Sequence, residues 1–172
     1  MDDAREPEAL LVSACLLGRA CTYRGDSNLD EVLRRELEQA RAEGARIVPF
    51  CPEEAGGLAT PRPPADLTGN ADEVLDGRAR VVTHGGVDVT EQFVAGAHRA
   101  LAAAQEAGVT RAVLKERSPS CGCAATHVAG ELVEGPGVTA ALLRRSGIRC
   151  EGAEGRRTLE RPDRGTPDRT GA

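Results

Sequence analysis

Four short apolar runs are spaced along the chain, and stretches with helical periodicity separate them. The runs, which we interpret as buried strands, lie at 10–12, 46–50, 111–115 and 148–150. The helical stretches, in which apolar residues recur every three to four positions, lie at 29–43, 90–107 and 137–146. This alternation predicts an α/β fold: a single Rossmann-like domain with a mainly parallel sheet, flanked by helices and joined by right-handed crossovers.

Three segments depart from the alternation. The segment 52–76 is rich in Pro and Gly, so we expect an ordered loop over the edge of the sheet and no further central strand. The segments 79–82 and 87–89 flank a glycine turn and predict a strand pair outside the main sheet. From 153 onward the chain has almost no apolar content, which predicts a domain at 8–152 and a flexible, disordered C-terminal tail at 153–172.

Composition narrows the possible partners. Aromatic residues make up 2% of the 172 residues and the net charge is -5, so neither a base-stacking surface nor a basic footprint for nucleic acid is present. The acidic N-terminus lacks the order of a signal peptide, and no apolar run approaches the ~18 residues of a membrane span. We therefore expect a cytoplasmic protein that acts on a small molecule, without a membrane partner; its oligomeric state stays open.

Three of the six cysteines follow predicted strands directly or within a short loop. They are Cys15, Cys51 and Cys121. Because the carboxyl ends of neighbouring parallel strands open on one crevice, these thiols are expected to converge. Three converging thiolates suit a metal ion or an iron-sulfur cluster, and the spacing alone does not separate zinc from a cluster. Cys21 and Cys123 are the alternative ligands, although both are more typical of buried apolar residues, as is Cys150.

Several motifs resemble the bacterial 2-thiouracil desulfurase family, in the same order, from about Leu10 to Cys150. The matching segments are Val12–Gly18, Tyr23–Asp26, Cys51–Leu58, Pro61–Ala65, Ser118–Gly122 and Gly137–Leu143. The resemblance implies a [4Fe-4S] cluster held by three cysteines, with the fourth iron open to take sulfur from a thiolated base. Cys15, Cys51 and Cys121 match the ligand positions.

Polar residues beside the predicted ligands are candidates for the reaction. Glu53 follows Cys51 by two residues and is predicted to be a general acid or base. Ser118 and Ser120 either cap the next turn or contact substrate through their hydroxyls, and Ser13 stands in the same relation to Cys15. Arg62 either forms a structural ion pair or holds an anionic or carbonyl group of the ligand. Of the three histidines, only His127 lies near the cysteine loop.

The predicted function is removal of sulfur from a small thiolated heterocycle such as 2-thiouracil. As the resemblance implies, Glu53 would transfer a proton while water replaces sulfur at the ring carbon, and the net reaction is non-redox. Two alternatives use the same cysteines: a zinc-dependent hydrolase, and a non-enzymatic iron-sulfur or redox sensor.

Overall fold

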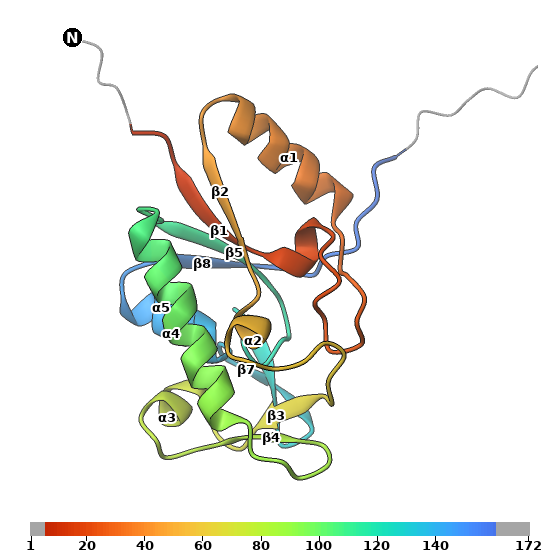
Figure 1. Ribbon diagram of the computed structural model, residues 1–172, viewed down its shortest axis with the longest axis vertical. Coiled ribbons are helices and arrows are strands. Elements are labelled where there is room, and N and C mark those ends of the chain that lie inside the picture. The colour runs from red at the N-terminus through yellow and green to blue at the C-terminus, as the bar shows by residue number, and fades with distance from the viewer. Residues whose placement is uncertain (1–5, 161–172) are drawn as a thin grey trace, which may run out of the picture.

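A computed structural model describes residues 6–160, and its centre is a four-stranded parallel sheet (Figure 1). The strand order is β2-β1-β5-β8, and every neighbouring pair runs parallel. The strands are β1 (Ala9–Ser13), β2 (Arg46–Phe50), β5 (Arg111–Lys115) and β8 (Arg149–Ala153). The predicted α/β fold with a mainly parallel sheet and flanking helices is therefore confirmed.

Helices cover both faces of this sheet. Side chains alternate between the faces along each strand, so each strand contributes side chains to the packing on both sides. Leu10 and Val12 of β1 pack with Leu33 and Leu37 of α1 (Glu31–Ala42) on one face. Leu11 points to the other face and joins the core that α4 (Thr90–Glu106) and α5 (Val138–Arg145) share. Figure 1 shows α1 on one side of the sheet and α4 and α5 on the other. Among the described residues, no helix is both long and apolar enough to cross a membrane.

A second, mixed sheet lies below the first, with the strand order β4-β3-β6-β7 (Figure 1). Its strands are β3 (Ala65–Leu67), β4 (Val81–Thr83), β6 (Ala125–Val128) and β7 (Glu131–Glu134). Leu67 and Val81 pack on Phe93 of α4 and Val74 of α3 (Ala71–Leu75). The helix α4 thus joins the cores of both sheets.

This second sheet corrects two expectations. The segment 52–76, which we expected to hold no further central strand, contains β3, and β3 is central because it pairs with β4 on one side and β6 on the other. The predicted strand pair at 79–82 and 87–89 does lie outside the main sheet, but β4 pairs mainly with β3, and only the bridge between Val82 and Asp88 joins the two predicted strands. Strands of three or four residues are too short to show a period-two pattern.

The chain beyond the predicted domain boundary at 152 packs on α1. β8 continues to Ala153, and the Glu31 backbone N–H then donates to the Arg157 carbonyl at 2.8 Å. The Arg157 guanidinium contacts the fully buried carboxylate of Asp30, the N-cap of α1, at 2.8 Å. Arg157, within the predicted tail, therefore contacts the start of α1 through a backbone hydrogen bond and an ion pair. The rest of the predicted tail, 161–172, lies outside the described residues.

Candidate active site

The carboxyl edge of the parallel sheet holds a cavity of about 560 Å³. The chain leaves β1 for β2 on one side and later returns to β5 on the other, so this edge is a topological switch point, where open α/β sheets bind ligands. All eight predicted site residues line the cavity: Ser13, Cys15, Cys51, Glu53, Arg62, Ser118, Ser120 and Cys121. The predicted residues are thus brought together from the end of β1, from the segments that follow β1, β2 and β5, and from the loop before β3.

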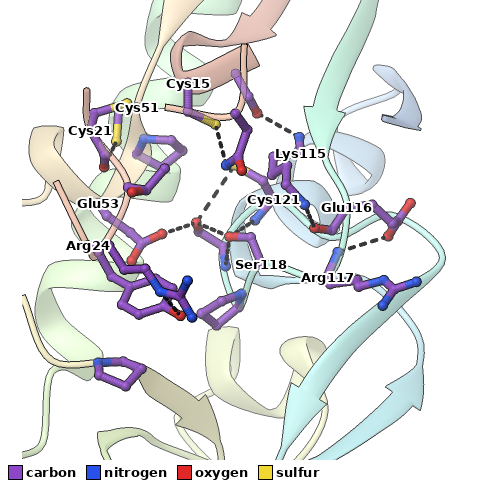
Figure 2. Close-up of a pocket in the computed structure, with 18 of the residues that line it drawn as sticks. Cys15, Cys21, Arg24, Cys51, Glu53, Lys115, Glu116, Arg117, Ser118 and Cys121 are labelled. Atoms are coloured by element: carbon purple, nitrogen blue, oxygen red, sulfur yellow. Dashed lines mark hydrogen bonds between the residues drawn. The ribbon is translucent and has the colours of Figure 1, made fainter. Parts of the chain in front are cut away.

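Each predicted ligand thiol is positioned by a different local structure. Cys15 lies in the short 3-10 helix η1 (Ala14–Leu17) after β1, where the Asn28 amide lies 3.6 Å from its sulfur. Cys51 is the N-cap of α2 (Pro52–Ala55), directly after β2. Cys121 lies in the loop after β5, with the Ser120 hydroxyl 3.7 Å from its sulfur. Figure 2 shows the three cysteines around the same space.

The loop that carries Cys121 is built by a serine and a glycine. The Ser118 hydroxyl accepts hydrogen bonds from the backbone N–H groups of Ser120 and Cys121, both at 3.2 Å. A side chain at Gly122 would collide with the carbonyl oxygens of Ala125 and Ser118, so only glycine allows this turn. Ser118 therefore caps the turn, as one of its two predicted roles requires.

Cys21, which the sequence marked only as an alternative ligand, lies beside two of the predicted ligands. Hydrogen bonding by the neighbouring Cys21 thiol lowers the pKa of Cys15 and lowers the pKa of Cys51 to about 7, although its single S–H serves one of them at a time. The same interactions raise the pKa of Cys21. Burial raises the pKa of Cys121, and the nearby Cys15 adds to the rise. The four thiols are therefore electrostatically coupled, and a bound cation would stabilise their thiolate forms.

Glu53 is the centre of a buried polar network that faces the cavity (Figure 2). Its carboxylate accepts a hydrogen bond from the Ser120 hydroxyl at 2.9 Å and one from the Arg62 guanidinium at 3.2 Å. The Ser120 hydroxyl in turn lies 3.0 Å from that of Ser118. This chain of hydroxyls and a carboxylate can move a proton between Glu53 and a ligand in the cavity.

Arg62 and Ser13 both make structural contacts. The Arg62 side chain is 6% exposed, and besides Glu53 it donates to the Cys21 carbonyl at 2.8 Å and to the Thr60 hydroxyl at 2.9 Å. The Ser13 hydroxyl accepts from the Lys115 backbone N–H at 2.9 Å, which ties the end of β1 to the end of β5. Of the two roles predicted for Arg62, the structure shows the structural ion pair, which it forms with Glu53.

Glu116 is a structural residue of the site that the sequence analysis missed. One of its carboxylate oxygens accepts hydrogen bonds from the backbone N–H groups of Cys123, Ala124 and Ala125, at 2.7, 2.9 and 3.2 Å. Although burial raises the pKa of Glu116, these backbone donors hold it below its ordinary value. A side chain at Gly152 would collide with this carboxylate. Glu116 therefore holds the loop after Cys121, and no spacing in the sequence signals it.

Comparison with known proteins agrees with the geometry. A sequence profile of the 2-thiouracil desulfurase family matches residues 10–154, which include the whole parallel sheet except the first residue of β1. The chain belongs to this family. The family predicted from the sequence motifs is thus confirmed, and the match covers every residue discussed above as part of the cavity.

A curated protein and a solved structure match this family member over most of its length. The uncharacterized protein YbbK of Bacillus subtilis (strain 168) is 42% identical over 144 residues, which cover 81% of this chain and 92% of that protein. The structure of a [4Fe-4S]-dependent thiouracil desulfidase, TudS, superposes with a TM-score of 0.72 at 44% identity. That match covers 84% of this chain and 90% of the other.

Proposed function

We propose that the protein is a desulfurase that removes sulfur from a thiolated pyrimidine such as 2-thiouracil, at a [4Fe-4S] cluster held by Cys15, Cys51 and Cys121. The observation that carries the proposal is the convergence of these three thiols with the Glu53 network on one cavity. The family match and the similarity to a [4Fe-4S]-dependent thiouracil desulfidase support it.

The donor set fits such a cluster. Iron-sulfur clusters are held by thiolates, and the cavity offers thiols from three separate loops. Within the described residues, the side chains close enough to share a single ion are Cys21, Cys51 and Glu54, and neither Cys15 nor Cys121 joins them. Thiolates that bind different irons of one cluster lie further apart than thiolates on one ion, so this separation favours a polynuclear group for Cys15, Cys51 and Cys121.

When bound, a cluster with three protein ligands supplies one open iron, a Lewis acid toward the sulfur of the substrate. The side chains of the cavity supply the proton transfers. We assign the general-base role to the Glu53 carboxylate, which takes a proton from the water that attacks the ring carbon and returns it to the departing sulfur. The atoms balance: water and the thiocarbonyl group of the substrate give a carbonyl group and hydrogen sulfide.

The neighbours of Glu53 suit that role. The Ser120 hydroxyl and the Arg62 guanidinium each bind one carboxylate oxygen, which sets the orientation of the group toward the cavity. The Ser118 hydroxyl lies next in line and extends the proton path toward the loop that carries Cys121. We assign Arg62 a positioning role, because its donors are committed to Glu53 and to the loops at Cys21 and Thr60.

Anaerobic purification with metal analysis and turnover tests the proposal. The protein should be brown, carry about four irons and four sulfides per chain, and release sulfide and uracil from 2-thiouracil in equal amounts. Protein that is colourless, holds one zinc and acquires no cluster from iron and sulfide after a chelator has removed the zinc would favour the zinc hydrolase instead. A full cluster without sulfide release from any thiolated pyrimidine would remove the desulfurase function and leave the iron-sulfur sensor.

A further inference from the structure

A second metal-binding arrangement overlaps the proposed cluster site. The sulfurs of Cys21 and Cys51 and a carboxylate oxygen of Glu54 all lie within 4.8 Å of one another. Ligands that share one tetrahedral zinc, at about 2.0–2.3 Å from the ion, lie roughly 3.5–4 Å apart. A small adjustment of side chains therefore closes the three groups around a single ion.

The backbone prepares this arrangement. Cys51 caps α2 and Glu54 is the third residue of that helix, so one helical turn brings both side chains to the same face. The helix α2 is held against α4 by Gly56 and Gly96, where any side chain would collide with the Gln92 and Pro52 carbonyl oxygens. Two of the three ligands thus come from one short, tightly packed element.

Cys21 is held toward the other two groups by its own loop. Its side chain is buried, at 2% exposure, and its carbonyl oxygen accepts a hydrogen bond from Arg62 at 2.8 Å. The sulfur of Cys51 lies 3.8 Å from the same carbonyl oxygen. The Cys21 loop and the start of α2 are therefore in direct contact, and Figure 2 shows the Cys21 and Cys51 side chains next to each other.

The carboxylate of Glu54 has an oxygen available for an ion. One oxygen accepts a hydrogen bond from the Thr60 hydroxyl at 2.9 Å, which orients the group as outer partners of metal ligands do. The other oxygen, Oε1, is buried and has no hydrogen bond from the residues that the structure describes. The Arg19 guanidinium lies 3.1 Å from it without hydrogen-bond geometry, and its side chain is 61% exposed. Exposed ion pairs are weak, so Arg19 can move away.

We propose that the protein, when it lacks its cluster, binds one Zn²⁺ through the sulfurs of Cys21 and Cys51 and the carboxylate of Glu54, with a water molecule as the fourth ligand. Two thiolates make the site soft and select zinc over magnesium or calcium, and a carboxylate is an established zinc ligand. The ion is distinct from the cluster because it needs neither Cys15 nor Cys121.

The two metal centres exclude one another, a consequence that rests on the proposed function. Cys51 is common to both sets, so a zinc ion on Cys21, Cys51 and Glu54 removes one of the three thiolates that the cluster requires. Zinc would thereby hold the protein in an inactive state until the ion is withdrawn.

Cobalt titration of the full-length, cluster-free, reduced protein tests the site, because Co²⁺ replaces Zn²⁺ and its thiolate bonds absorb visible and near-ultraviolet light. Wild type should bind one Co²⁺ per chain, and Zn²⁺ should displace it. Cys21→Ser should weaken binding by more than the ~10–100-fold that loss of an outer partner costs, and Glu54→Gln should also weaken it. The matched control, Cys121→Ser, should bind Co²⁺ as wild type does.

Cluster reconstitution with iron and sulfide should give the opposite ranking. Cys21→Ser and Glu54→Gln should acquire the full iron content, whereas Cys121→Ser should not. Wild type loaded with Zn²⁺ should stay colourless until a chelator is added, and Cys21→Ser should resist this block. Circular dichroism checks the fold of each variant, and Glu54→Gln provides the same test if Cys21→Ser does not fold.

Two results would overturn the zinc site: no Co²⁺ binding by wild type, or equal weakening by Cys21→Ser and Cys121→Ser. The second would place the ion on the thiols assigned to the cluster. Failure of every protein to acquire iron would instead contradict the proposed function, and it would leave the cobalt result standing.

Discussion

Two neighbouring thiols are equally hidden from solvent, and yet only one of them lines the cavity. Cys121 is 4% exposed and Cys123 is 5% exposed, although only one residue separates them. The Cys121 sulfur lies beside the hydroxyls of Ser120 and Ser13 at the cavity. Cys123 does not line the cavity; like Cys150 it packs beside apolar side chains of β5 and α5, in a cluster that also includes Cys121.

Burial raises the pKa of both Cys121 and Cys123, so access to the cavity, and not the protonation state, separates these two thiols. Burial raises the pKa of Cys123 to about 12, so this thiol stays protonated and behaves as an apolar side chain. Cys51, which is half-buried, has a pKa of about 7 because the Cys21 thiol donates to it. A thiol becomes a ligand where polar neighbours and an open cavity accompany it.

The largest expected difference is between Cys121→Ala and Cys123→Ala. Because Cys121 is a proposed ligand, its replacement should reduce the iron content and the release of sulfide to background. Cys123→Ala should keep both, since Cys123 does not line the cavity. Iron, sulfide and turnover measured on both anaerobically prepared variants check the prediction. Equal loss in the two variants would erase the distinction between the cavity and the core.

A second matched pair is Glu53→Gln and Glu54→Gln. Loss of the proton-transfer group in Glu53→Gln should keep the cluster and slow sulfide release by the ~100- to 10,000-fold typical of general acid-base catalysis. Glu54 contacts Thr60 and Arg19 instead of the serine network, so Glu54→Gln should change the rate much less. Uracil and sulfide formation by cluster-loaded proteins provides the measurement. If Glu53→Gln matches wild type, another group performs the acid-base step.

Alkylation of the cluster-free protein sharpens the comparison of pKa values. The thiolate is the reactive form, and lowering the pKa of Cys51 from 9.0 to about 7 means that its thiolate is formed as the pH rises through about 7. Its reaction with iodoacetamide should therefore accelerate from about pH 6 to 8 and then level off. Cys123, with its raised pKa and buried sulfur, should stay unmodified over this range. Mass spectrometry of the peptides identifies each site. A Cys51 rate that still climbs through pH 9 would contradict the lowered pKa.

The smallest expected effect concerns stability in the cluster-free state. Cys123→Ala removes a sulfur from a packed core and should lower the free energy of unfolding by about 1 kcal/mol. That loss corresponds to a melting temperature lower by roughly 2–4 °C. Cys51→Ala, at a half-buried position, should shift the melting temperature less. Calorimetry on the reduced proteins decides the order, and a larger loss for Cys51→Ala would show that its thiol contacts stabilise the empty site.

Local sequence patterns predicted the strands of the parallel sheet and the helices that flank it. The limits of β2 and β5 agree with the predicted strands at 46–50 and 111–115, because short apolar runs mark strands; β5 is buried at its centre, whereas β2 is an edge strand with half-buried and exposed residues. Of the second sheet, only the strand at 79–82, which overlaps β4, was predicted; β3, β6 and β7 have three or four residues each and become strands by pairing with other segments. Cys21 was undervalued for the same reason: its partners, Cys51 and Glu54, come from another element.

The sequence by itself determined the α/β class, the family, and eight of the residues that line the cavity, since strand ends and short motifs are local properties of the chain. Only the tertiary structure decided which atoms meet. It placed the carboxylate of Glu53 on Ser120 and Arg62, put Cys121 and not Cys123 at the cavity, and brought Cys21 to Cys51 and Glu54. These contacts depend on how loops from different strands pack against one another. The spacing of residues along the chain does not encode the direction in which each side chain points after that packing.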